Sequence, residues 1–232
     1  MSSSRSEFID PATVQVKRSG TISDVTFREF DGVDPVTAAS RILGGTLSAN
    51  GVVVRIVEVE AYGTDPGGPW PDPASHSYPG PTRRNAVMFG DPGCLYVYLS
   101  YGMHRCLNVT CSPPGVAGAV LLRSAEVVDG EDIAFARRPT ARRPADLARG
   151  PGNLGNALGI ALEDNGSCLF GADARIQLSL DPVTEWAAGP RVGISTAADR
   201  PWRLWLPGSP AVSTYRRSPR APGVGLAEGS TA

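Results

Sequence analysis

Two carboxylates lie near the end of one apolar run of the sequence. Glu58 and Glu60 belong to the segment VVVRIVEVEAY, residues 52–62. The β-branched residues of this segment predict a strand, in which side chains two residues apart project from the same face, about 7 Å from one another. A glutamate at the desolvated rim of an apolar sheet can act as a general base toward a water molecule. Glutamates also commonly end strands for purely structural reasons, so these residues alone leave both interpretations open.

A cluster of tyrosines follows in the segment CLYVYLSYGMH, residues 94–104. In strand register Tyr96 and Tyr98 share one face, and Tyr101 stands beside Gly102 at the turn of a predicted hairpin. Paired rings on a sheet form a platform for flat bases, each worth about 1–3 kcal/mol when stacked. An aromatic side chain on a protruding hairpin can wedge between stacked bases. Core packing explains the paired rings equally well, but it does not explain a bulky ring at a turn.

The patterns around these residues predict one domain of the α/β (α+β) class. Three apolar-alternating runs separated by glycine-containing turns predict an antiparallel meander. Together with the strand over residues 52–62, they indicate a curved, mainly antiparallel sheet with a protruding β-hairpin. Capping residues and helical spacing predict short flanking helices after Asp34-Pro35 and after residues 150–152. Further short strands are predicted over residues 175–180, 191–195 and 202–206.

The domain is expected to span residues 21–215, between an N-terminal extension, residues 1–20, and a tail, residues 216–232. The tail reads RRSPRAPGVGLAEGSTA and has little to bury, so it is predicted to be disordered. Residues 63–85 are rich in proline and glycine and predict a long loop. Aromatic residues in that loop favour an ordered, functional one.

The charge of the chain is nearly balanced but unevenly distributed. The formal net charge is -1, which does not by itself indicate a nucleic-acid partner. Arginines gather in two segments, residues 137–149 and 200–220. These segments predict either a basic face or two solvated charge runs, and the sequence does not decide between them. Only one of the 22 basic residues is a lysine, Lys17.

No segment of the sequence indicates export, a membrane or a metal. No long apolar run is present, and the first residues have neither a signal core nor a basic amphipathic pattern. The four cysteines match no secreted disulfide framework, so a cytoplasmic location with reduced thiols is expected. The spacing of Cys94, His104, Cys106 and Cys111 is irregular, which favours packing over zinc binding.

Several longer motifs, taken together, resemble the alkyladenine (3-methyladenine) DNA glycosylase family of the single-domain type. The matching segments are RIVEVEAYG, ASHSYPGPTRRN, MFGDPGCLYVYLSYGMHRCLNVTC, AVLLRSAE and GPGNLGNALGI. Weaker matches are REFDGVDPVTAASRILG and PWRLWLPGSPAVS. Such ordered agreement along most of the chain is far more specific than one short motif.

The resemblance implies roles for particular residues in catalysis and base binding. Glu60 corresponds to the family's water-activating general base, and Arg123 to an arginine near the catalytic water. Tyr62, His76 and Tyr98 correspond to the walls around the flipped base. Asn108 corresponds to a pocket residue that screens guanine-type bases by their 2-amino group, whereas Glu58 is expected to be structural.

The resemblance also implies which residues contact DNA. Tyr101 corresponds to the side chain that fills the space left by the extruded nucleotide, and Met103, Tyr96 and Arg84 are expected to contact DNA nearby. The chain departs from the family pattern at two places. The loop between Tyr62 and His76 is longer and richer in proline, and Asn153 replaces a lysine that is frequent in relatives.

The expected function is DNA repair: flipping alkylated, and by extension deaminated, purines out of duplex DNA and hydrolysing the glycosidic bond. A cationic alkylated base stacks favourably on electron-rich rings. No lyase activity is expected, because a Schiff base requires an amine and Lys17 lies in an unpromising segment. The resemblance further implies a monomer, associated with the nucleoid of a bacterial cell, that needs no cofactor. A non-catalytic reader of damaged DNA and a hydrolase of free purine nucleosides remain as alternatives.

Overall fold

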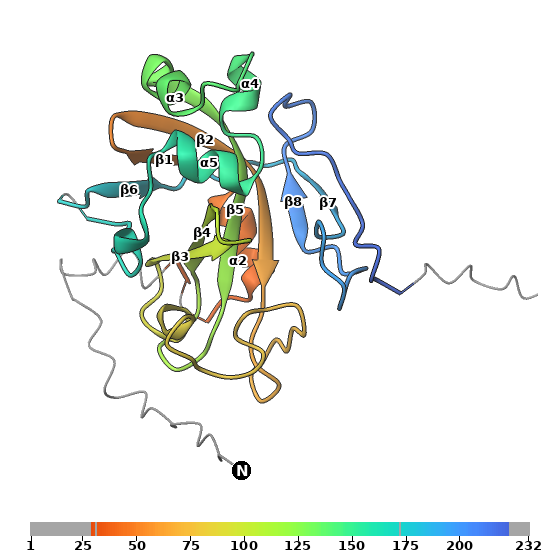
Figure 1. The fold of residues 1–232 in the computed structure, drawn as a ribbon. Helices are drawn as coiled ribbons and strands as arrows, with labels where there is room; N and C mark the ends of the chain where they lie inside the picture. Colours follow the sequence, from red (N-terminus) through yellow and green to blue (C-terminus); the bar gives the residue numbers. More distant parts are fainter. Residues whose placement is uncertain (1–28, 31, 172, 223–232) are drawn as a thin grey trace, which may run out of the picture.

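An antiparallel sheet forms the body of the protein in the computed structural model, which describes residues 29–222 except 31 and 172 (Figure 1). Six strands pair in the order β3-β4-β5-β2-β1-β6, and β8 pairs with both β2 and β7. All pairings are antiparallel, and the three runs predicted as a meander form β3, β4 and β5. The strands are β1 (Thr46–Ala49), β2 (Val52–Tyr62), β3 (Leu95–Ser100), β4 (His104–Thr110), β5 (Ala119–Asp129), β6 (Ile176–Ser179), β7 (Ala187–Gly189) and β8 (Arg203–Trp205).

Strand β2 is the most enclosed strand of this sheet. It pairs with β1 over its first residues, with β5 along most of its length, and with β8 around Glu58 to Glu60. The register with β5 shifts on both sides of Glu58, which marks a β-bulge there. Both carboxylate side chains are fully buried and not exposed at a strand end. The prediction of a central strand over residues 52–62 is confirmed.

Short helices cover the sheet, and the first begins and ends where the sequence predicts. Asp34 caps α2 (Pro35–Ile42) by accepting hydrogen bonds from the backbone N–H groups of Val36 and Thr37. Gly44 follows the helix with a positive φ of 91°. The other helical segments are α3 (Glu131–Arg137), α4 (Pro144–Leu147), α5 (Pro151–Ala157) and the 3-10 turns η2 (Ala86–Phe89) and η3 (Leu162–Asp164).

Helix α5 packs against β4, close to the β3–β4 hairpin. Gly155 makes this approach possible, because a Cβ atom there would lie 2.2 Å from the carbonyl oxygen of Arg105. Arg137 and Arg138 donate hydrogen bonds to the backbone carbonyls of Ala157 and Leu147, at the ends of α5 and α4. Most of the arginines in residues 137–149 therefore make hydrogen bonds or ion pairs within the protein. Arg143 likewise pairs with Asp146, and Arg149 donates to Val212.

The sheet and helices share one apolar core, which makes the described chain a single α+β domain. Fully buried members come from β2, β4, β5 and helices α2 and α5. A smaller buried cluster includes Tyr96 of β3 and comprises Met88, Tyr96, Ala117 and Ala119. No helix among the described residues is long and apolar enough to cross a membrane.

One of the three further strands predicted from the sequence is wrong. Residues 191–195 do not form a strand, because Arg191 points into the protein interior and Gly193 has a φ of 73°. The strand of this region is β7, further toward the N-terminus.

The predicted N-terminal extension, residues 1–20, lies outside the described residues, as do residues 223–232 of the predicted tail. The described part of the predicted tail contacts the domain, since Arg217 pairs with Asp199.

Candidate active site

An open cavity of about 350 Å³ lies between the hairpin strands, the 63–85 loop and the segment after Arg191. Most of the residues expected at the active site line it, although they come from five separate parts of the chain. Residues that sequence reasoning did not single out also line it, among them Ala74, Met88 and Pro151. The predicted site residues in its lining are Glu60, Tyr62, His76, Tyr96, Tyr98, Tyr101, Asn108 and Arg123.

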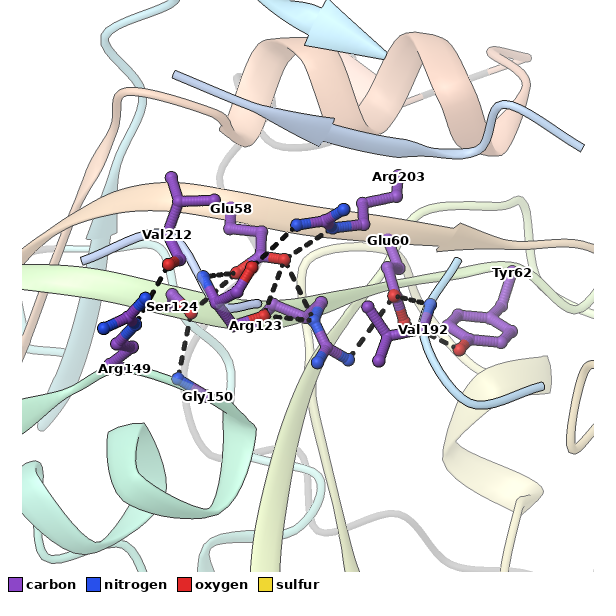
Figure 2. Close-up of polar contacts among 11 residues, drawn as sticks. Glu58, Glu60, Tyr62, Arg123, Ser124, Arg149, Gly150, Val192, Arg203 and Val212 are labelled. Carbon is purple, nitrogen blue, oxygen red and sulfur yellow. Dashed lines mark hydrogen bonds and ion pairs between the residues drawn. The ribbon is translucent and has the colours of Figure 1, made fainter. Parts of the chain in front are cut away.

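Glu60 is held by three donors at the inner wall of the cavity. Its Oε2 accepts a hydrogen bond from the Tyr62 hydroxyl at 2.9 Å, and its Oε1 accepts one from the Val192 backbone N–H at 2.7 Å. Arg123 Nη1 lies 3.4 Å from the same Oε1. Figure 2 shows Glu60 pointing from β2 between these groups. Burial and the nearby Glu60 carboxylate raise the pKa of Tyr62, so its hydroxyl stays protonated and remains a donor.

Glu58, two residues before Glu60, is the centre of a buried charge network (Figure 2). Arg123 Nε and Arg203 Nε donate to its Oε1 at 3.1 and 2.6 Å. Ser124 Oγ and the Ser213 backbone N–H donate to its Oε2 at 2.7 and 2.8 Å. Burial alone raises the pKa of Glu58, but the charge of Arg123 and these hydrogen bonds outweigh it and hold the pKa below its usual value. Glu58 therefore stays ionised and orients Arg123.

Aromatic rings form the side of the cavity that faces Glu60. The His76 and Tyr98 rings meet edge to face, with centroids 4.6 Å apart, and Tyr96 packs beside Tyr98 at 5.7 Å. His76 Nδ1 lies 3.1 Å from the Tyr96 hydroxyl, and the Arg84 guanidinium lies over the Tyr98 ring. Burial, followed by the charge of Arg84, lowers the pKa of His76 below its ordinary 6.5. The cavity wall thus presents neutral, electron-rich rings.

The 63–85 loop that carries His76 is ordered by its own contacts. Asn85 Nδ2 donates to the His76 and Gly80 carbonyls, and Ser77 Oγ donates to the Gly63 carbonyl at 2.9 Å. Gly63 is required at the start of the loop, because a Cβ atom there would lie 2.1 Å from the Trp70 carbonyl oxygen. These contacts fix His76 across from Tyr98.

Asn108 and the hairpin border the cavity on its β4 side. Asn108 Nδ2 donates one hydrogen bond to the Tyr96 carbonyl at 3.1 Å, which leaves its second N–H and its side-chain oxygen able to meet a ligand. At the hairpin turn Tyr101 has a φ of 50° and is 91% exposed, and Met103 is 65% exposed. Two large side chains therefore project into solvent at the hairpin turn, and Tyr101 also lines the cavity.

Comparison with known proteins identifies the family. The family model described as methylpurine-DNA glycosylase (MPG) matches residues 29–210. The chain belongs to the methylpurine-DNA glycosylase family. A relative from Nocardia farcinica is 68% identical over 195 residues, covering 83% of this chain and 92% of that protein. Relatives from Rhodococcus jostii and Mycobacterium leprae are 58% and 59% identical, over 90% and 84% of this chain and 95% and 92% of theirs. Each is provisionally named a 3-methyladenine DNA glycosylase.

Two expected DNA-contacting residues of this glycosylase lie outside the cavity lining. Arg84 is exposed beside Tyr98, and Met103 is exposed in the turn between β3 and β4. Asn153, which replaces the frequent lysine, donates through Nδ2 to the Arg149 carbonyl at 2.7 Å. Its side chain therefore links the first turn of α5 to the segment that precedes the helix.

Sequence reasoning missed the groups that reach the glycosylase site from the C-terminal third of the chain. Val192 contributes a backbone N–H to Glu60, and Ser213 contributes two donors to Glu58. A backbone donor has no sequence signature. Arg203 is marked only by its place in WRLWL, where a buried arginine within an apolar strand requires a buried partner.

Proposed function

We propose that the protein is a monofunctional DNA glycosylase that releases alkylated purines, with 3-methyladenine as a substrate, from duplex DNA. One observation carries this proposal: a fully buried carboxylate, Glu60, opens on a ring-lined cavity beside a hairpin that exposes Tyr101. The family membership and the names of the relatives agree with it. A single purine base is small enough for a cavity of about 350 Å³. The base can enter the cavity only after it has left the DNA helix.

The proposed reaction is a single hydrolytic step. Glu60 accepts a proton from a water molecule while the water oxygen attacks C1′ of the extruded nucleotide. The bond between C1′ and the ring nitrogen breaks, and its electron pair goes to the base, which neutralises the positive charge of the alkylated purine. The products are a free base and an abasic sugar carrying a hydroxyl group. Arg123, fixed by Glu58, lies where it can hold the water and the oxygen atoms of the extruded nucleotide.

Strand cleavage is not part of the proposed reaction. An amine nucleophile would be needed to form a Schiff base with the opened sugar. The single lysine of the sequence, Lys17, lies outside the described residues, and every side chain named in the cavity lining lacks an amine. Borohydride added during the reaction is expected to trap no covalent protein–DNA product, and a trapped product would contradict the monofunctional mechanism.

Assay of the purified protein on two substrates tests the proposal. One substrate is duplex DNA treated with dimethyl sulfate, and the other is a set of free methylated purine nucleosides. Chromatography is expected to detect 3-methyladenine released from the duplex and no cleavage of the free nucleosides. Binding without any release would make the protein a reader of damaged DNA, and cleavage of free nucleosides would make it a nucleoside hydrolase.

Tyr101→Ala is expected to slow base release from duplex DNA by about 5–150-fold, because one stacked aromatic contact is worth roughly 1–3 kcal/mol. The exposed ring would no longer fill the gap left by the extruded nucleotide. The measurement is single-turnover release from methylated duplex, with Tyr215→Ala as the control, since Tyr215 is a partly exposed tyrosine packed on Arg203. Equal release rates for wild type and Tyr101→Ala would contradict the proposal that Tyr101 fills the gap in the duplex.

The His76 ring is expected to titrate below 6.5, because burial and the Arg84 charge disfavour its protonated form. Protonated His76 would place a cation against a cationic base. The contribution of His76 to the rate of 3-methyladenine release is therefore expected to be complete above the folded pKa of His76 and to fall as the pH drops through it. NMR of imidazole-labelled protein, with His76→Gln for assignment, measures the midpoint. The wild type is expected to lose more release rate than His76→Gln on acidification, and parallel profiles would contradict the role of the neutral ring.

A further inference from the structure

A fully buried ion pair lies directly behind the ring of Tyr62. Arg191 Nη1 and Nη2 donate to Asp72 Oδ2 and Oδ1 at 2.6 and 2.8 Å, which is a bidentate contact. Neither side chain has any accessible surface. Asp72 comes from the 63–85 loop, and Arg191 comes from a segment 119 residues later in the chain. The pair therefore joins two separate walls of the cavity.

Arg191 also fixes the ring that contacts the proposed general base. Its guanidinium lies 4.6 Å from the centroid of the Tyr62 ring and 5.2 Å from that of Trp202. Nη1 donates in addition to the Ala61 carbonyl at 2.9 Å. The guanidinium is thus placed between two aromatic rings and tied to β2 one residue before Tyr62. Tyr62 in turn donates its hydroxyl to Glu60.

The residue after Arg191 supplies the second donor to Glu60. Val192 N–H reaches Glu60 Oε1 at 2.7 Å, so displacement of Arg191 would move this donor as well. Asp72 meanwhile accepts hydrogen bonds from the backbone N–H groups of Gly63 and Ala74, which begin and close the turn leading to His76. One ion pair therefore connects the Tyr62 ring, the Val192 donor and the loop of His76.

We propose that Asp72 and Arg191 are positioning residues of the active site, whose bidentate contact sets the orientation of Glu60 and the separation of the Tyr62 and His76 walls. This inference rests on the glycosylase function proposed above. A buried ion pair contributes little net stability compared with apolar residues of the same volume, so specificity of arrangement is the property that it supplies best. The planar, forked guanidinium is needed for this, because an ammonium group can neither bind the carboxylate in bidentate fashion nor stack on both rings.

The test uses Asp72→Asn and Arg191→Lys in the full-length protein, with single-turnover release of 3-methyladenine from dimethyl sulfate-treated duplex. Both variants are expected to lose about 10–100-fold in the limiting rate, because small misplacements of reacting groups cost rates of that order. The protein concentration that gives half the limiting rate is expected to change by less than about threefold, since the DNA-facing hairpin is untouched. Asp72→Asn keeps the shape of the side chain, and Arg191→Lys keeps its charge, so each is a separate test should the other fail to fold.

A stability control separates positioning from general loosening of the fold. Leu178→Ala creates a cavity in β6, at the opposite end of the sheet from the hairpin, and is expected to lower the melting temperature by an amount comparable to that of the ion-pair variants. At a temperature where all variants are folded, its limiting rate is expected to equal that of the wild type. An equal rate loss in Leu178→Ala, or wild-type rates in both ion-pair variants, would overturn the inference. Absence of release by the wild type would instead overturn the proposed function.

Discussion

Glu60→Gln is expected to lower the single-turnover rate of base release by about 10²–10⁴-fold, the usual contribution of a positioned general base. The carboxylate is fully buried, opens on the cavity and has its lone pairs directed by Tyr62, Val192 and Arg123. Glutamine has the same shape but cannot accept the proton of the attacking water. The rate is measured on methylated duplex, together with the affinity for duplex containing a stable abasic-site analogue.

The affinity of Glu60→Gln for the abasic analogue is expected to stay within a few-fold of the wild type, because Tyr101 and the outer hairpin are unchanged. Glu126→Gln is the matched control. Glu126 lies on β5, outside the cavity lining, and accepts a hydrogen bond from Ser209 Oγ. A Glu60→Gln protein that releases bases at the wild-type rate would remove the general base from the mechanism.

Glu58→Gln is expected to destabilise the fold by about 3–5 kcal/mol, the cost of removing one member of a buried ion pair. The change removes the buried carboxylate that pairs with Arg203, and it leaves Arg123 with only the longer contact to Glu60. Urea unfolding at neutral pH measures this loss as a lower midpoint. Base release is also expected to slow, because Arg123 would no longer be held toward Glu60.

The stability loss in Glu58→Gln should depend on pH in a defined direction. The folded pKa of Glu58 is lowered from 4.5, so the stability that its ionised form contributes is complete above that value and is lost as the pH falls through the folded pKa. The difference in urea midpoint between wild type and Glu58→Gln is therefore expected to persist at pH values above 4.5 and to shrink below. A difference that grows on acidification would contradict the ion-pair network.

The elements that the sequence predicted correctly are those specified by neighbouring residues. The cap of Asp34, the β-branched run of β2 and the alternation of the β3–β4–β5 meander act within a few positions of one another. Local signals of this kind survive folding when tertiary packing agrees with them. The hairpin with Tyr101 at its turn belongs to the same category, and its exposure follows from the strands that precede and follow it.

The parts of the site that the sequence left open depend on contacts between distant residues. Glu58 and Glu60 look equivalent in the sequence, yet one is enclosed by two arginines and two serines and the other opens on the cavity. That difference is made by β5, by β8 and by Ser213, which lies 155 residues beyond Glu58. The interior direction of Arg191 is set by Asp72 in the same way, which is why an apparent strand there is irregular.

The position of β2 within the sheet has a consequence for how activity is lost under stress. A strand bonded on both sides exchanges its amide protons only when the whole domain opens, whereas peripheral segments open individually at lower cost. Glu58 and Glu60 lie on such a strand. The two carboxylates of the proposed mechanism are therefore expected to lie in the most slowly opening unit of the domain. Local opening of peripheral segments is therefore expected to leave Glu58 and Glu60 in place. Loss of the candidate site is expected to coincide with global unfolding of the domain.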